Sequence, residues 1–275
     1  MAGTLYVVAT PLGNLGDLSP RAADTLKRVA VVAAEDTRHS KPLLHHAGSH
    51  AELISFHEHS SDRALERIVR ILTDGRDVAL ITDAGTPAIS DPGVALVAAA
   101  RERGIQVVTI PGPNAVAASV SVSGISGDRY LFLGFLPRKG GDRRRFLLTA
   151  AQSEWTVVLF EAPNRVTQLL ADLIEVCGPE RQAAVSRELT KVFEETRAGT
   201  LQELSEHYAE APVRGEVTVV LSGTGKEHVE EPPPDPGERA KALLAEGMSR
   251  KDVADRLVEE TGISRNSAYR LVNEL

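Results

Sequence analysis

Residues 83–93 combine side chains that could do chemistry with the backbone of a ligand-binding loop. The segment reads Asp-Ala-Gly-Thr-Pro-Ala-Ile-Ser-Asp-Pro-Gly and follows the apolar run 78–82, which predicts a buried parallel strand. Open α/β sheets bind ligands in loops at the carboxyl ends of such strands, where glycine permits close approach and proline stiffens the turn. Helix punctuation is an alternative for the second half, with Asp91 as N-cap and Pro92 at the first helical position. Since that alternative does not account for residues 83–87, the first half predicts a ligand loop.

Two further loops of this kind each follow a predicted strand. Residues 10–17 follow strand 4–9, and residues 111–116 follow strand 106–110 and enter a segment of small residues. The loop at residues 10–17 lacks the G-x-G-x-x-G spacing of a dinucleotide fold and the lysine of a P-loop, which disfavours nucleotide hydrolysis. We expect the three loops to converge on one crevice.

The elements that must position these loops alternate along the chain. We expect strands at 4–9, 29–34, 77–82, 106–110, 130–135, 155–160, 183–188 and 216–222. Helical patterns lie between them, which predicts an α/β fold with mostly parallel sheets. The segment 110–113 is the expected internal boundary, giving one α/β domain at 1–112 and a second at 113–226.

A short helical module is predicted at the end of the chain. Residues 227–237 are proline-rich and predict a stiff linker, and residues 238–275 predict three helices. The last two helices are joined in a helix-turn-helix-like pattern. This module has seven basic and seven acidic residues, so its charge is balanced. It is as consistent with a packing or docking module as with a nucleic-acid-binding one.

Composition excludes several classes of protein. The 275 residues are 42% hydrophobic and 25% charged, as in soluble globular proteins. No apolar run reaches the roughly 20 residues of a membrane helix, and no signal sequence is present, so we expect neither membrane association nor secretion. One cysteine excludes a disulfide framework and indicates the reducing cytoplasm. No histidine or cysteine group has the spacing of a zinc site, so no metal is expected.

One basic cluster interrupts this acidic chain, whose net charge is −7. It predicts contacts with phosphate, and in particular with RNA, by Arg138, Lys139, Arg143, Arg144 and Arg145. The alternative is a solvated loop that leads into a helix.

Seven motifs in order resemble the tetrapyrrole methylase superfamily. They lie at residues 10–17, 34–38, 83–93, 111–116, 132–139, 160–165 and 215–218. Within the superfamily they are most similar to the enzymes that methylate a cytidine ribose 2′-oxygen of bacterial 16S rRNA. The resemblance spans residues 4 to about 225, and the helical tail also fits that subfamily.

The resemblance implies two α/β domains with S-adenosyl-L-methionine in the cleft between them, and a homodimer that acts on 16S rRNA or the 30S subunit. By motif position, the implied cofactor-binding residues are Pro11, Gly13, Asp83, Gly85, Thr86, Ile89, Ala115, Val116, Ala162 and Thr218.

A ribose hydroxyl is a poor nucleophile near neutral pH, so a base or a cationic neighbour should assist the transfer. The candidate catalytic residues are Glu35, Asp36, Arg38 and Glu161, followed by His57, His59, Arg165 and Glu188. Each has a structural alternative. Asp36 can cap a helix that starts near Thr37, and Glu161 can pair with Arg165 across one turn.

Two other functions compete with rRNA methylation. The first is C-methylation of a tetrapyrrole, such as a cobalamin or sirohaem precursor; the basic cluster and the tail argue against it, since a small substrate needs neither. The second is a helix-turn-helix regulator whose α/β part senses a ligand. The near-neutral tail weakens it, because non-specific DNA affinity comes mainly from cationic contacts.

Overall fold

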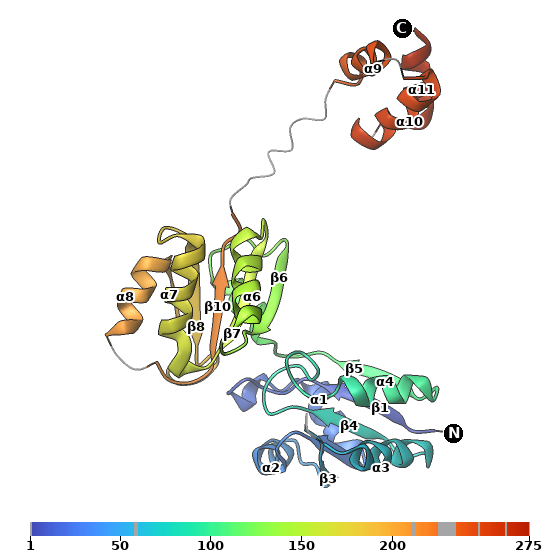
Figure 1. The fold of residues 1–275 in the computed structure, drawn as a ribbon. Helices are drawn as coiled ribbons and strands as arrows, with labels where there is room; N and C mark the ends of the chain where they lie inside the picture. Colours follow the sequence, from blue (N-terminus) through green and yellow to red (C-terminus); the bar gives the residue numbers. More distant parts are fainter. Residues whose placement is uncertain are drawn as a thin grey trace. The chain divides into compact units, whose positions relative to one another are not determined.

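The computed structural model describes residues 2–57, 60–210, 213–224, 235–246, 248–261 and 263–274. These residues divide into two compact units, Met1–Thr224 and Gly225–Leu275 (Figure 1). The larger unit contains two five-stranded sheets, and the smaller unit contains three helices.

The first sheet is doubly wound. Its strands run parallel in the order β3-β2-β4-β1-β5 and are β1 (Thr4–Val8), β2 (Val31–Ala34), β3 (Glu52–Ser55), β4 (Val78–Ile81) and β5 (Gln106–Ile110). Helices α1 (Pro20–Arg28) and α2 (Thr37–His46) pack on one face. Helices α3 (Asp62–Thr73) and α4 (Val94–Glu102) pack on the other face. Because both faces are covered, β2 and β4 consist of buried apolar residues throughout.

The strand order explains where this sheet binds a ligand. The chain leaves β1 toward β2 on one side, and it leaves the neighbouring strand β4 toward β5 on the other side. The loops after β1 and β4 therefore separate at the carboxyl edge of the sheet, which is the crevice where open α/β sheets hold ligands.

The second sheet is mixed. Its order is β6-β7-β10-β8-β9, with β6 (Tyr130–Phe135), β7 (Thr156–Glu161), β8 (Gln182–Arg187), β9 (Glu195–Thr200) and β10 (Val217–Leu221). β6 and β7 are parallel, whereas β10 is antiparallel to β7 and β8, and β9 is antiparallel to β8. The prediction of mostly parallel sheets is therefore wrong for this half.

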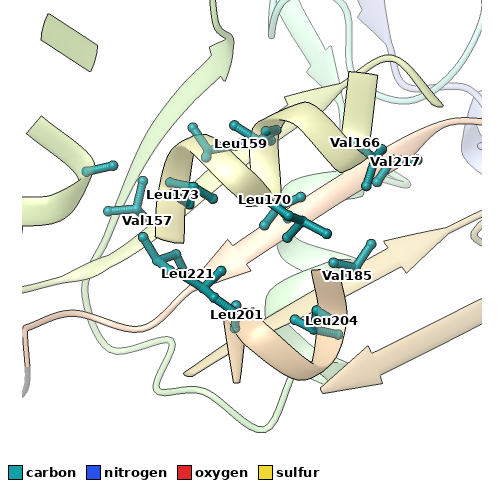
Figure 2. Packing of buried hydrophobic residues seen from close by; sticks show 14 of the residues in the cluster. Val157, Leu159, Val166, Leu170, Leu173, Val185, Leu201, Leu204, Val217 and Leu221 are labelled. Carbon is teal, nitrogen blue, oxygen red and sulfur yellow. The ribbon is translucent and has the colours of Figure 1, made fainter. Parts of the chain in front are cut away.

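Three helices cover one face of the second sheet: α6 (Gly141–Gln152), α7 (Val166–Cys177) and α8 (Leu201–Ala209). Figure 2 shows Leu170 and Leu173 of α7 among Leu159, Val185 and Leu221 of the strands. Helix α5 (Ala115–Val122) packs on the opposite face. A capping box is present at the start of α8, where the Thr200 and Glu203 side chains each accept a bond from the other's backbone N–H.

The smaller unit has its own core. Helices α9 (Pro236–Ala245), α10 (Arg250–Thr261) and α11 (Arg265–Glu274) bury Leu243, Leu257 and Val272 against one another. The three predicted tail helices are thus confirmed. The predicted linker at 227–237 lies largely outside the described residues.

The α/β fold class is confirmed, and each predicted strand is present. The edge strands β3 and β9 were not predicted. In the described part of the chain, no helix is long and apolar enough to cross a membrane.

Candidate active-site cleft

The loops after β1 and β4 are joined by a short backbone bridge. The Thr10 N–H donates to the Gly85 carbonyl at 2.8 Å, and the Gly85 N–H donates to the Thr10 carbonyl at 3.1 Å. The Thr10 hydroxyl also donates to the Thr82 carbonyl at 3.1 Å. Polar groups of these two loops are satisfied by each other, which holds both loops at one edge of the sheet.

The loop after β4 has a constrained backbone. Ala88 and Ser90 have φ angles of 67° and 59°, in the left-handed region that side chains other than glycine rarely adopt. Gly93 has a φ of 142° and is the N-cap of α4, with no side-chain capping bond. The helix therefore starts at Val94, and the prediction that Asp91 caps it is wrong. Asp91 instead lines a cleft.

The same loop abuts the second α/β half. The Thr86 hydroxyl donates to the Pro113 carbonyl at 3.1 Å. Gly134 lies at an irregularity of β6 with a φ of 62°, and a Cβ atom there would come 2.9 Å from the Ser90 hydroxyl. The absence of a side chain at position 134 lets Ser90 approach the strand.

A cleft of about 430 Å³ lies between these walls. Its volume is within the range of sites for small molecules and cofactors. All seven motifs contribute lining residues to it, from Leu12 to Thr218. The predicted convergence of the three loops is thus observed, since Leu12, residues 83–91 and Asn114 share one cavity.

The cleft brings together most of the predicted cofactor-binding residues. Those that line it are Asp83, Gly85, Thr86, Ile89, Ala115, Ala162 and Thr218. Pro11, Gly13 and Val116 do not. Pro11 is buried, Gly13 lies under the aliphatic part of Lys191, and Val116 packs beside Val158 and Val220.

The titratable side chains that line the cleft are all acidic among the described residues: Glu35, Asp83, Asp91, Glu161 and Glu216. Asp83 is held by the Asp36 backbone N–H at 3.1 Å and by the His39 imidazole Nδ1 at 3.1 Å. Glu35 accepts from the Thr82 hydroxyl at 2.8 Å. Burial, and then the negative charge of Glu35, raise the pKa of Asp91 to about 6.

Of the predicted catalytic residues, Glu35 and Glu161 line the cleft and the other two do not. Asp36 accepts from the Arg38 backbone N–H and caps α2, which confirms the structural alternative for this residue. Its carboxylate also pairs with the exposed Arg38 guanidinium at 2.7 Å, and this hydrogen bond lowers the pKa of Asp36 well below its usual range.

Glu161 is a buried anchor at the end of β7. Its Oε1 accepts from the Ala162 N–H at 2.9 Å and lies 3.2 Å from Arg165 Nε, so the predicted one-turn pair is confirmed. Neither His57 nor Glu188 is among the lining residues, and His59 lies outside the described residues. Glu188 pairs with Lys191 at 3.0 Å.

The basic cluster divides into one buried and four exposed cations. Arg143 is only 7% exposed; its Nε and Nη2 donate to Asp172 at 2.8 and 2.5 Å, and its Nη1 donates to the Pro137 carbonyl. It is therefore not available to a phosphate, contrary to the prediction. The side chains of Arg138, Lys139, Arg144 and Arg145 are exposed, and Arg145 pairs with Asp142 at 3.2 Å.

A sequence profile of the tetrapyrrole (corrin/porphyrin) methylases matches residues 4–205. The chain belongs to this family. Among curated relatives, the ribosomal RNA small subunit methyltransferase I of Synechocystis sp. is 42% identical, over 99% of this chain and 98% of its own length. The protein of the same name from Pseudomonas aeruginosa is 44% identical, over 98% of this chain and 96% of its own length.

Solved structures of two other proteins share the fold. A uroporphyrin-III C-methyltransferase from Thermus thermophilus, solved in complex with S-adenyl homocysteine, is 19% identical with a TM-score of 0.60, over 80% of this chain and 97% of its own. A diphthine synthase is 14% identical with a TM-score of 0.63, over 80% of this chain and 89% of its own.

Several cleft residues of this tetrapyrrole methylase were not predicted as site residues. Asn114 caps α5 through bonds from the Val116 and Ala117 N–H groups. Phe135 of β6 and Phe160 of β7 pack with ring centroids 5.5 Å apart and ring planes tilted by 58°. Asn114 follows a strand and precedes small residues, so its capping position was detectable. Asp91 had a detectable signal as well, but an N-cap explained it equally well.

Proposed function

We propose that this methylase transfers a methyl group from S-adenosyl-L-methionine to the 2′-oxygen of a cytidine ribose in 16S rRNA of the small ribosomal subunit. The observation that carries the proposal is full-length similarity. The curated relatives named for small-subunit rRNA align with 98–99% of this chain, tail included, at 42–44% identity. The C-methyltransferase from Thermus thermophilus aligns with 80% of the chain at 19% identity, which supports the fold and not the tetrapyrrole substrate.

The charge of the cleft supports the cofactor. S-adenosyl-L-methionine has a sulfonium and an ammonium group against one carboxylate, so it has a net positive charge. The carboxylates of Glu35, Asp83 and Asp91 face the same cavity, and they favour a cation by Coulomb attraction. A phosphate-containing cofactor would meet repulsion there. Gly85, Ala115 and the other small residues would contact the cofactor through backbone groups and shape.

The exposed cations after β6 support an RNA substrate. Arg138, Lys139 and Arg144 lie on a surface loop and the first turn of α6, in a protein with a net charge of −7. A local group of cations on an acidic protein directs a polyanion to one place. From the family resemblance, we also propose a homodimer in the cytoplasm.

Methyl transfer with labelled S-adenosyl-L-methionine tests the function. The protein is incubated with 30S subunits, free 16S rRNA or a tetrapyrrole precursor, and labelled RNA is digested to nucleosides. Label in a 2′-O-methylcytidine supports the proposal. Label confined to the tetrapyrrole, or in a base rather than a ribose, contradicts it.

A charge reversal tests the RNA surface separately. The double variant Arg138→Glu/Arg144→Glu should weaken 30S binding, and log Kd should depend less steeply on log salt, by roughly one to two units of slope. The control reverses Lys27 and Arg101, two exposed cations of the first α/β half. Equal slopes for the two double variants would place the RNA contact elsewhere.

A further inference from the structure

The five carboxyl groups of the cleft differ in what holds them. Glu161 is held by the Ala162 N–H and Arg165, and Asp83 by the Asp36 N–H and His39. Glu216 pairs with Lys191 Nζ at 3.1 Å, outside the cavity. Asp83 and Glu216 are engaged by these contacts. Glu161 Oε2 is buried without a hydrogen bond, but it lies 3.9 Å from Arg143 Nη1, so the Glu161 charge is paired with two arginines.

Asp91 is different. Like Glu35, whose carboxylate accepts from the Thr82 hydroxyl at 2.8 Å, it forms no ion pair with a cation of the described residues. It is about half-buried and lines the cavity. The three left-handed residues Ala88, Ser90 and Gly93 place Asp91 in the cleft and not at the start of α4. Strained backbone of this kind is kept where the surrounding structure requires one geometry, and it is frequent at functional sites.

The groups around Asp91 tune its proton affinity. Burial raises its pKa most, followed by the negative charges of Glu35, Asp83 and Glu216, while the Thr82 hydroxyl lowers it. The resulting value of about 6 leaves the carboxylate ionised at neutral pH. It is also closer to neutrality than an ordinary aspartate, and a general base is most effective when its pKa lies near the working pH.

We propose that Asp91 is the general base that accepts the proton of the ribose 2′-hydroxyl during methyl transfer. The inference rests on the proposed function. In the step, the 2′-oxygen forms a bond to the methyl carbon as the carbon–sulfur bond breaks, and that electron pair stays on sulfur. The hydroxyl proton passes to the Asp91 carboxylate, so the products are the 2′-O-methyl ribose, the neutral thioether and a protonated Asp91, which returns its proton to solvent.

Single-turnover methylation of 30S subunits between pH 5 and 8 tests this role, with saturating labelled S-adenosyl-L-methionine. We expect the rate of the unmodified enzyme to fall about tenfold per pH unit below pH 6, where Asp91 becomes protonated. Asp91→Asn should be slower by about 100-fold or more at pH 7.5 and should lack this inflection. Asp91→Glu should keep an inflection, because it keeps a titrating carboxyl.

Two further variants separate a chemical from a structural role. Asp24→Asn removes the same charge from an exposed position on α1 and should match the unmodified enzyme. Glu35→Gln removes a negative neighbour, so it should move the inflection of the pH profile to lower pH. Calorimetric titration with S-adenosyl-L-methionine checks that Asp91→Asn keeps its cofactor affinity within about threefold of the unmodified enzyme.

The outcomes are distinguishable. If the unmodified enzyme methylates no ribose, the proposed function fails, and with it the hydroxyl substrate that the assignment of Asp91 requires. If it methylates ribose, two results overturn only the assignment of Asp91 as the base. In the first, Asp91→Asn retains the rate and the inflection; in the second, it loses cofactor affinity in proportion to its rate. If Asp91→Asn fails to fold, the pH profile of the unmodified enzyme still decides. A methylation rate that does not change between pH 5 and pH 7 refutes the inference.

Discussion

Replacing Arg143 by methionine should destabilise the second α/β half strongly. The guanidinium is buried and donates three hydrogen bonds, two to Asp172 and one to the Pro137 carbonyl, and it lies 3.9 Å from the buried Glu161 carboxylate. Methionine has a similar length but no donors, so it leaves Asp172 without a cation. Breaking a buried pair costs ~3–5 kcal/mol. We expect about 3 kcal/mol, since Gln168 still donates to Asp172 at 2.8 Å.

That loss corresponds to a melting temperature lower by roughly 6–12 °C, at ~2–4 °C per kcal/mol for a unit of this size. Trp155, the one tryptophan of the chain, lies directly before β7 and reports unfolding of this half by fluorescence. The matched control is Arg144→Met, which removes the next, exposed cation and should change stability by less than about 0.5 kcal/mol. If both variants unfold at the same urea concentration, Arg143 is not a structural residue and the division of the basic cluster is wrong.

Three other changes have defined outcomes. Gly134→Ala should weaken S-adenosyl-L-methionine binding and lower the melting temperature more than Gly48→Ala does. Both glycines have φ near 65°, but a Cβ atom contacts Ser90 only at position 134. Equal effects of the two variants in calorimetry and melting would rule out the contact. In urea unfolding at pH 7.5, Asp91→Asn should be more stable than the unmodified protein by about 1 kcal/mol after solvent screening. At pH 4 the two proteins should have the same free energy of unfolding. The sign follows because the raised pKa makes ionisation of Asp91 cost folding free energy as pH rises from 4 to 6; a gap that persists at pH 4 would contradict it. Truncation after Thr224 should keep cofactor affinity within about twofold but lower 30S methylation at least tenfold, and unchanged methylation would exclude docking by the tail.

Central strands that are buried on both faces have the clearest sequence patterns. Apolar runs such as β4 and β10 stand out because each consists of buried apolar or β-branched residues. The edge strands β5 and β6 were predicted because they have apolar runs, whereas the edge strands β3 and β9 were not. β3 reads Glu-Leu-Ile-Ser and has one buried residue, and β9 reads Glu-Thr-Arg-Ala-Gly-Thr and has none. An edge strand is identified by its hydrogen-bonded neighbour, which sequence does not show.

The sequence predicted which loops form the site, but it predicted the roles of individual side chains less well. Small residues after three strands located the cleft, since a parallel strand directs its following loop to one edge of the sheet. The burial of Arg143 was hidden because its partner, Asp172, is 29 residues away on another helix. The role of Asp91 was hidden for another reason: Asp-Pro is a good helix start, and only the backbone at Gly93 shows that the helix begins later.

The cleft also constrains the order in which the protein matures during synthesis. Its walls come from residues 12 to 218, so the first sheet is complete at residue 110, long before the facing wall exists. At the usual speed of translation, roughly 5–20 s separate the two events. A ligand cannot protect the first sheet in that interval. Its persistence on the ribosome must therefore come from its own two cores around residues such as Leu26 and Ile68.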